Sequence, residues 1–312
     1  MIFRIGTRGS RLALAQSEWV RRGVETRFPD VHVELVRIKT RGDKILDTPL
    51  SKVGGKGLFV KEIEEALLRN EVDVAVHSMK DVPAELPEGL DLLVFPERED
   101  PRDALISAQG EPFEALPSGA RIGTSSLRRA AQVLQKRPDL RIVSLRGNVD
   151  TRLGRLESGD LDAVVLAAAG LRRLGLAHRV TQFLEPSVLL PAIGQGALGL
   201  EMRIGDERAL EVFGFLNHEP TEIQVRAERA LLRKLEGGCQ VPIAGHAVVQ
   251  DQRLILDGLV AELDGSEVIA HRAEGDADRP EEIGMALAQK LLSSGAGAIL
   301  GRIYGSQVER PM

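Results

Sequence analysis

The sequence lacks the residues from which several common kinds of functional site are built. Its 312 residues include a single cysteine, Cys239, and six scattered histidines. A lone cysteine excludes an intramolecular disulfide and a zinc site made of cysteine ligands. The histidines show no short metal-binding spacing such as His-Glu-x-x-His. The sequence therefore predicts chemistry that uses no metal.

Long apolar runs and an excess of positive charge are also missing. The longest apolar stretches, such as residues 163–171, fall far short of the ~20 residues that cross a bilayer. Residues 1–4 show no charged segment and long apolar run of a signal peptide. The formal net charge is −5, which does not favour nucleic acid. We expect a cytoplasmic protein that binds neither membrane nor nucleic acid, so any anion site must come from local clusters of Arg and Lys.

Short apolar strands alternate with amphipathic helices over residues 1–215. Several strands are nearly continuous runs of Val, Ile, Leu and Ala, as in parallel strands that are buried on both faces. This alternation predicts α/β lobes with parallel sheets. The predicted strands are 3–6, 32–38, 72–76, 90–95, 121–123, 141–145 and 163–167, and the predicted helices are 11–28, 58–70, 127–136, 149–159 and 207–216.

Two segments divide this part of the chain. A polar, proline-bounded segment at 96–102 predicts a linker between two lobes, and a segment rich in Gly and Ala at 191–199 predicts a second crossing. Beyond residue 219, apolar and polar residues alternate over 248–275, with Asp264-Gly265 as a hairpin turn, and a helix with proline at its start follows at 280–294. The predicted domains are a first lobe of 1–98 plus about 195–215, a second lobe of 99–194, and a small α+β domain of 219–312.

Three predicted strand-to-helix junctions carry arginine where helices usually begin with acidic residues. Each has a loop of Gly, Ser, Thr or Asn ahead of the helix. A cation there costs roughly 0.3–1 kcal/mol, because the free N–H groups already carry partial positive charge. Free N–H groups and guanidinium groups together attract anions, so the pattern indicates a ligand with many carboxylates or phosphates. The alternative for each arginine is an extended side chain in solvent or a pair with a nearby acid. The residues are Arg8, Arg11, Arg128, Arg129, Arg146 and Arg152.

A glycine-rich loop and an acidic residue extend the candidate site. Lys52 and Lys56 lie in the loop 51–59, which lacks the Walker A spacing and is interpreted as a basic flap over a cleft, with an ordinary exposed loop as the alternative. Asp81 follows the predicted strand at 72–76. A carboxylate in a basic cleft can transfer protons or stabilise a developing cation, although Asp81 could also simply cap a turn.

The lone cysteine lies in a loop, between Gly237-Gly238 and Gln240-Val241-Pro242. A structural cysteine is more often found inside an apolar run. A loop cysteine beside glycine is approachable and can carry a covalent group. The residues alone leave a covalent and a structural role equally open.

Taken in order, these segments resemble the porphobilinogen deaminase (hydroxymethylbilane synthase) family. The resemblance covers essentially the whole chain and is strongest from residue 3 to about 245. The matching segments are IGTRGSRLALAQ, KTRGD, GGKGLFVKEIE, DVAVHSMKDVP, REDPRDALIS, IGTSSLRRAAQ, LRGNVDTRL, LAAAGLRRL, PAIGQGALG and LEGGCQVPI.

The resemblance implies a cytosolic, usually monomeric, three-domain transferase of haem and tetrapyrrole synthesis. The first two lobes would be similar to type II periplasmic binding proteins, with the active cleft between them. Cys239 would carry a dipyrromethane cofactor through a thioether. Four porphobilinogen molecules would be deaminated, joined head to tail on this primer and released as hydroxymethylbilane.

The resemblance also implies roles for individual residues. Asp81 would protonate the leaving amine and then pair with the azafulvene cation. Each porphobilinogen carries an acetate and a propionate, so a growing chain needs many cations. The implied carboxylate-binding residues are Arg8, Arg11, Arg128, Arg129, Arg146, Arg152 and Arg173, the hydrogen-bonding residues are Ser10, Lys80, Thr124, Ser126 and Gln195, and the flap residues are Lys52, Lys56 and Phe59. The competing hypothesis is a non-enzymatic bilobal anion-binding protein, which accounts for the arginines but not for Asp81 or the Gly-Gly-Cys loop.

Overall fold

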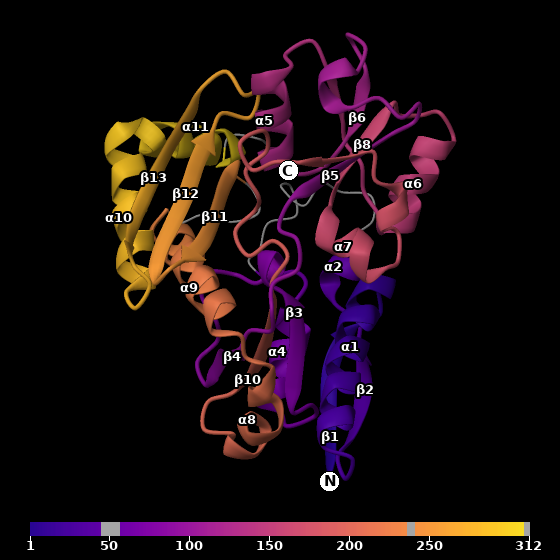
Figure 1. The fold of residues 1–312 in the computed structure, drawn as a ribbon, viewed down its shortest axis with the longest axis vertical. Helices are drawn as coiled ribbons and strands as arrows, with labels where there is room; N and C mark the ends of the chain where they lie inside the picture. The colour runs from indigo at the N-terminus through magenta and orange to yellow at the C-terminus, as the bar shows by residue number, and fades with distance from the viewer. Residues whose placement is uncertain (45–56, 236–240, 309–312) are drawn as a thin grey trace.

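Three β-sheets organise the chain (Figure 1). The computed structural model describes residues 1–44, 57–235 and 241–308. One five-stranded sheet lies at the lower end of the view in Figure 1, the second lies at the upper end, and a three-stranded sheet lies beside them. The first two sheets form two α/β lobes, and the third belongs to a smaller α+β domain, as the sequence predicts.

The first lobe is built on a sheet with the strand order β2-β1-β3-β10-β4. Strand β1 pairs in parallel with β2 and β3, whereas β10 runs antiparallel to β3 and β4. Phe3, Val74, Leu200 and Phe213 lie in the core of this lobe. Its strands are β1 (Ile2–Arg8), β2 (His32–Ile38), β3 (Val74–Ser78), β4 (Leu90–Val94) and β10 (Leu198–Arg203), and its helices are α1 (Arg11–Arg27), α2 (Arg41–Lys44), α4 (Lys61–Leu68) and α8 (Glu207–Phe213).

The second lobe repeats this arrangement, with the strand order β7-β6-β8-β5-β9. Strand β6 pairs in parallel with β7 and β8, and β5 is antiparallel to β8 and β9. Apolar clusters cover both faces of the sheet. Its strands are β5 (Asp103–Ser107), β6 (Arg121–Gly123), β7 (Arg141–Val143), β8 (Ala163–Ala167) and β9 (Gln182–Leu184), and its helices are α5 (Leu127–Lys136), α6 (Val149–Glu157) and α7 (Ala168–Arg173).

Each of the two chain crossings leads into the antiparallel strand of a lobe. The linker 96–102 leads into β5 of the second lobe, and the segment 191–197 leads into β10 of the first. The sequence predicts both crossings but neither strand. The parallel-rich sheets are confirmed, with one opposed strand in each, while the domain boundaries given above remain predictions.

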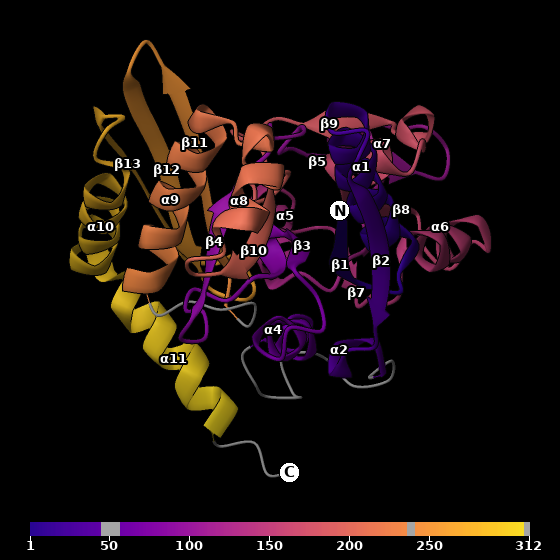
Figure 2. The same cartoon turned by 90° about the horizontal axis from the view of Figure 1, so that it is seen from below.

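The third domain is an antiparallel meander covered by helices. Its strands are β11 (Ile243–Gln250), β12 (Arg253–Ala261) and β13 (Val268–Asp276), and its helices are α9 (Glu219–Lys234), α10 (Pro280–Leu291) and α11 (Gly297–Val308). The turn predicted at Asp264-Gly265 joins β12 to β13, with Gly265 at φ +73°. Asp251 and Gln252, both at positive φ, form a second hairpin turn that the sequence analysis missed. Helices α9 and α10 pack against each other beside this sheet (Figure 2).

One helical stretch, Pro280–Gly305, is long and apolar enough to cross a membrane. Gly295, at φ +108°, breaks it into α10 and α11 of 12 residues each. Each half is shorter than the ~20 residues that a membrane span needs. Leu287, Leu291 and Ile299 are fully buried in the core of the third domain. These features indicate that the stretch forms two core helices of a folded domain and does not span a membrane.

Candidate active site

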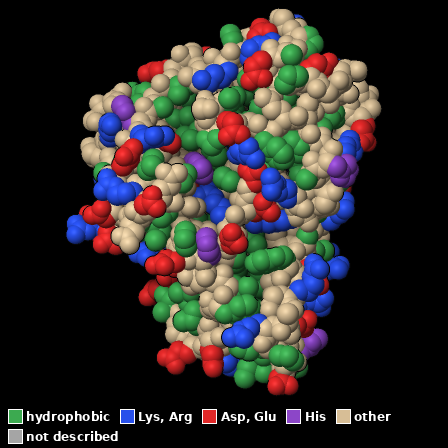
Figure 3. All heavy atoms as spheres, in the orientation of Figure 1, with side chains coloured by type: hydrophobic (Ala, Val, Ile, Leu, Met, Phe, Trp, Pro, Cys, Tyr) green, Lys and Arg blue, Asp and Glu red, His purple; other side chains and the backbone are tan. Residues whose placement is uncertain are grey.

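A cavity of about 830 Å³ lies between the first two lobes. It is lined by residues that follow β1 and β3 in the first lobe and β6, β7 and β8 in the second. The carboxyl ends of parallel strands are where α/β folds bind ligands. The volume falls within the range of about 300–1,000 Å³ that encloses small ligands. On the face shown in Figure 3, Lys and Arg side chains gather across the middle of the molecule, where the lobes meet.

The three predicted arginine junctions all face this cavity, and each has the expected N-cap. The Oγ of Ser10 accepts from the backbone N–H of Ala13 at 3.2 Å, and that of Ser126 accepts from Arg129 at 3.4 Å. The Oδ1 of Asn148 accepts from the N–H of Thr151 at 2.8 Å. A capped terminus fixes the loop ahead of it. The prediction of three capped helix starts is therefore confirmed.

Positive charge dominates the lining of the cavity. Among the described residues, eight cationic side chains and two carboxylates, Asp81 and Asp150, contribute to it. The cations are Arg8, Arg11, Lys39, Lys80, Arg129, Arg146, Arg152 and Arg173. Burial lowers the pKa of Arg152 and of Arg173 to about 10. Cations held away from water attract a ligand with several carboxylates, because such a ligand supplies the missing countercharge.

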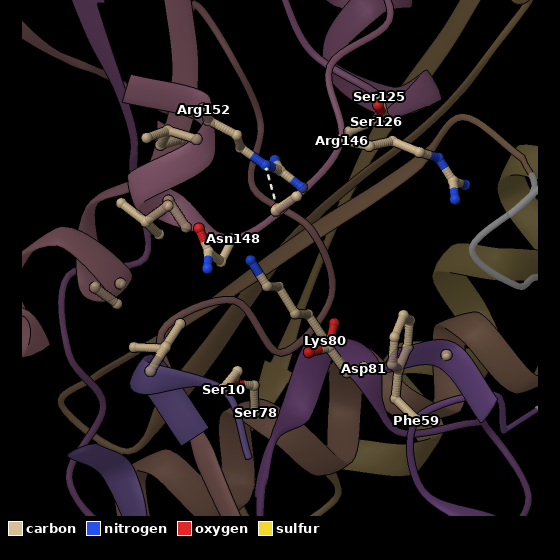
Figure 4. A pocket seen from close by; sticks show the side chains of 18 of the residues that line it. Ser10, Phe59, Ser78, Lys80, Asp81, Ser125, Ser126, Arg146, Asn148 and Arg152 are labelled. Atoms are coloured by element: carbon tan, nitrogen blue, oxygen red, sulfur yellow. Dashed lines mark hydrogen bonds between the residues drawn. The ribbon is translucent and has the colours of Figure 1, made fainter. Parts of the chain in front are cut away.

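Lys80 and Asp81 lie together on the wall formed by the first lobe. Both belong to the short 3₁₀ helix Met79–Asp81 that follows β3. Burial lowers the pKa of Lys80 to about 8, while Asp81 opposes this shift. Figure 4 shows Lys80 extending toward Asn148 and Arg152 of the second lobe, with Asp81 near its base and Phe59 to one side. Asp81 is thus an acid within reach of a ligand that the cations surround.

The structure brings most of the predicted site residues together. The following predicted residues line the cavity: Arg8, Ser10, Arg11, Phe59, Lys80, Asp81, Thr124, Ser126, Arg129, Arg146, Arg152 and Arg173. The ring of Phe59 lies 4.2 Å from the guanidinium carbon of Arg8. Cys239, Lys52 and Lys56 lie outside the described residues.

Arg128 and Gln195 do not line the cavity. Both are almost fully buried, at 4% and 1% exposure. Arg128 Nη1 lies 2.8 Å from Asp103 Oδ2, and Gln195 Nε2 donates to Asp103 Oδ1 at 3.0 Å. The two side chains therefore stand behind the wall, in contact with a buried carboxylate that the sequence analysis did not single out.

Several lining residues escaped the sequence analysis. Gln16 Nε2 donates to Ser78 Oγ at 2.8 Å, and Lys39 adds a cation at the end of β2. Asp150 forms a 2.9 Å ion pair with Arg11, which joins the two lobes across the cavity. Gln16 lies on α1 four residues after Leu12, which also lines the cavity, so its helical position was the available signal. The partners of Arg11 and Lys39 depend on tertiary structure.

In the described part of the chain, no group of three or more His, Cys, Asp or Glu residues is arranged to hold a metal ion. On the first sheet, His77 Nε2 lies 2.8 Å from Glu201 Oε2. Both side chains are buried. His77 therefore has a structural partner and does not face the cavity.

Some solved structures resemble this fold distantly. One is the second substrate-binding domain of a putative amino acid ABC transporter from Streptococcus pneumoniae, with a TM-score of 0.44, 13% identity and coverage of 69% of this chain and 91% of that chain. Another is the aliphatic sulphonate binding protein SsuA from Escherichia coli, with a TM-score of 0.41, 15% identity and coverage of 99% and 79%.

Sequence comparison is far more specific. Residues 3–211 match the family model described as "Porphobilinogen deaminase, dipyromethane cofactor binding domain", and residues 222–293 match its "C-terminal domain". The porphobilinogen deaminase of Geobacter metallireducens is 58% identical over 307 residues, covering 98% of this chain and 96% of the relative. That of Syntrophotalea carbinolica is 59% identical over 300 residues, covering 96% and 95%. The chain therefore belongs to the porphobilinogen deaminase family.

Proposed function

We propose that this chain deaminates four porphobilinogen molecules, joins them head to tail on a covalently bound dipyrromethane primer and releases hydroxymethylbilane. The observation that carries the proposal is the cavity, whose described lining combines eight cations with Asp81. Porphobilinogen carries two carboxylates and an aminomethyl group, so it needs both cations for binding and an acid for loss of the amine. The names of the close relatives support the same substrate.

The residues of the cavity fit the primer as well as the substrate. Two linked pyrrole rings bring several acetate and propionate groups, and the cations of both lobes are available to pair with them. When bound, the dipyrromethane would supply the terminal pyrrole carbon to which the first unit is joined, and each later unit would join the ring added before it. We assign its attachment to Cys239, the only cysteine in the chain.

Carboxylate binding falls to the arginines of the three junctions and of α7. Arg8 comes from the first lobe, and Arg129, Arg146, Arg152 and Arg173 come from the second. A guanidinium binds a carboxylate through two parallel N–H donors, which fixes orientation as well as affinity. Ser10, Lys80, Thr124 and Ser126 add donors, and Lys52, Lys56 and Phe59 are assigned to a flap. Arg11 is paired with Asp150, and Arg128 and Gln195 act from behind the wall.

Asp81 carries the proton transfers. Its carboxyl gives a proton to the aminomethyl nitrogen, the C–N bond breaks and ammonia leaves. The resulting carboxylate then faces the azafulvene cation and lowers the energy of that charge. After the new C–C bond forms, the pyrrole carbon that made the bond loses its proton, and the carboxylate can take it. The acid is thus restored for the next unit.

The cellular location, the oligomeric state and the absence of macromolecular partners complete the proposal. The cations of the site lie inside a cavity while the net charge is −5, which does not favour a nucleic acid partner. We propose a cytoplasmic monomer that acts without membrane or nucleic acid.

The decisive experiment is the intact mass of the protein before and after brief exposure to porphobilinogen. We expect an excess equal to two linked pyrrole units, growth in single-unit steps, and loss of both in Cys239→Ser. A folded protein whose mass never changes would favour a non-enzymatic anion-binding protein.

A further inference from the structure

Asp103 is a fully buried carboxylate that the proton transfers do not use. It is the first residue of β5 and is 0% exposed. Its Oδ1 accepts from Arg129 Nη2 at 2.7 Å, Arg129 Nε at 3.0 Å and Gln195 Nε2 at 3.0 Å. Its Oδ2 lies 2.8 Å from Arg128 Nη1. Three side chains from α5 and from the crossing segment therefore converge on one carboxylate.

This contact fixes one edge of the Arg129 guanidinium. The Nε and Nη2 groups bind Asp103, while Nη1 donates to the carbonyl oxygen of Val165 at 3.0 Å. A guanidinium has five N–H donors. These three bonds leave one N–H on each terminal nitrogen, and Arg129 lines the cavity. The side chain therefore has a held edge and donors still available beside the ligand space.

The negative charge of Asp103 stabilises the two buried guanidinium groups that contact it. Burial acts to raise the pKa of Asp103, but Arg128 and Arg129 outweigh it and lower that pKa to about 2. Burial lowers the pKa of Arg128, with Asp103 opposing the shift. Two adjacent buried guanidinium groups without a countercharge would repel each other and carry an uncompensated desolvation cost. Ionised Asp103 is the partner that allows both to stay in place.

We propose that Asp103 is a positioning residue, which holds Arg129 in a fixed orientation at the cavity wall so that it meets a pyrrole carboxylate without rearranging. The inference rests on the proposed function, because it concerns how that carboxylate is bound. Arg128 and Gln195 contact Asp103 from behind the cavity wall, and together with Asp103 they form the clamp on Arg129. Groups that are oriented before the ligand arrives bind it better, because no ordering cost remains to be met on binding.

Asp103→Asn tests the clamp, because it keeps the shape and removes the charge. We expect the KM for porphobilinogen to rise about 10-fold while kcat changes much less, or the two-unit mass of the primer to be lost from folded protein. The first result means that Arg129 meets the incoming substrate, and the second means that it meets the primer. An unchanged KM together with full primer occupancy would overturn the proposal.

Asp73→Asn is the matched control. Asp73 is also a buried carboxylate among arginines, with Arg4, Arg203 and Arg208 within 3.7 Å, but it does not line the cavity. Its loss should leave KM and primer mass unchanged, and an equal effect in both variants would reduce Asp103 to a general stabilising role.

A second variant keeps the test open if Asp103→Asn does not fold. Asp103→Glu retains the charge but moves the carboxylate by one methylene, so it should fold and still raise KM or lose primer. Normal values for both would contradict the proposal. Failure of the proposed function is distinct, since wild-type protein would then show no mass growth with porphobilinogen.

Discussion

Among the described carboxyl groups outside the cavity, that of Glu64 on α4 has a strongly raised pKa. It is 6% exposed and lies near the buried pair of His77 and Glu201. Burial raises the pKa of Glu64 from 4.5 to about 7, the negative charge of Glu201 adds to the shift, and His77 opposes it. A group of this kind favours the folded state only while it keeps its proton.

The expected consequence is a fall in stability as the pH rises from about 4.5 to about 7. Over this range the unfolded chain releases the Glu64 proton and the folded chain retains it. Glu64→Gln stays neutral, so relative to wild type it should gain roughly 2–3 kcal/mol between pH 5 and pH 8. Urea unfolding at both pH values measures this gain. Glu65→Gln, at a neighbouring half-exposed position, should show no such gain, and a pH-independent difference for Glu64→Gln would refute the assignment.

Asp81 is the residue on which the proposed chemistry depends most directly. Asp81→Asn preserves size and hydrogen bonding but removes the transferable proton and the charge. We expect a folded protein that still carries the two-unit primer, because the cations that bind it are untouched. Its turnover should fall by about 10²–10⁴, the usual contribution of a general acid or base. Near-normal ammonia release would remove Asp81 from the mechanism.

At the scale of elements, the two segments that cross between the lobes contact each other closely. Gly196 lies at φ +89°, and its carbonyl oxygen accepts from Glu99 N–H at 3.3 Å and from Arg173 Nη2 at 2.7 Å. A Cβ at this position would fall on the carbonyl oxygen of Glu99. The two crossing segments therefore lie too close together at residue 196 to leave room for a side chain.

Gly196→Ala should destabilise the protein by about 1–3 kcal/mol more than backbone strain alone, because overpacking is added to it. Gly110→Ala isolates the strain, since Gly110 lies at φ +85° and an added methyl carbon there would have nothing within 4 Å. That control should lose about 1–2 kcal/mol. Chemical unfolding of both variants gives the difference, and equal losses would mean that the crossing relaxes freely.

The elements that the sequence predicts are those whose pattern is local. Strand β8 is a continuous apolar run, the first half of β2 alternates polar and apolar residues, and α1, α5 and α6 begin at Ser10, Ser126 and Asn148 caps. Three of the missed elements contain buried charges that other parts of the fold neutralise. Strand β5 begins with Asp103, β10 contains Glu201, and α9 buries Glu228 in its apolar face. Their partners are distant in sequence, so no local pattern shows that they are buried.

The residues of the site were also predictable only where the signal lies within one segment of the sequence. Arginines at helix starts signalled a cavity for anions because the violation is visible within each junction. Arg128 and Arg129 are adjacent in sequence and look equivalent, yet only Arg129 lines the cavity. Asp103 contacts both side chains, but their other partners differ: Arg128 Nη1 donates to the carbonyl oxygen of Leu190 at 2.6 Å, whereas Arg129 Nη1 donates to that of Val165 at 3.0 Å. Helical geometry alone could not assign the two roles.

At the scale of the whole molecule, buried pairs join the third domain to the lobes. Arg98, in the linker, forms a 2.7 Å ion pair with Glu228 of α9. Glu228 also accepts from the backbone N–H of Gly194 at 2.6 Å and of Ala247 at 2.8 Å. One carboxylate thus ties together the linker, the second crossing and β11. This junction is buried, whereas the contact across the cavity is exposed.

The Arg11–Asp150 pair is the contact across the cavity, with side chains 57% and 48% exposed. An exposed pair contributes about 0–1 kcal/mol, so it favours the arrangement of the lobes in which it forms by no more than about 5-fold. Such a weak contact can form and break as the bound chain grows. The sequence instead predicts that Arg11 binds ligand carboxylates, and the two roles have different consequences.

A double-mutant cycle separates these roles of Arg11. If its partner is Asp150, Arg11→Ala and Asp150→Asn should change the KM for porphobilinogen by similar small factors in the same direction, and the double variant should match either one alone. If Arg11 binds ligand carboxylates, Arg11→Ala should raise KM, whereas Asp150→Asn frees the guanidinium and should lower it. We expect the first pattern, because Asp150, 2.9 Å away, already supplies Arg11 with a countercharge. The effect of the pair on KM should also become smaller as the salt concentration rises, since both side chains are exposed and salt screens such pairs. Opposite signs for the two single variants would return Arg11 to the carboxylate-binding set.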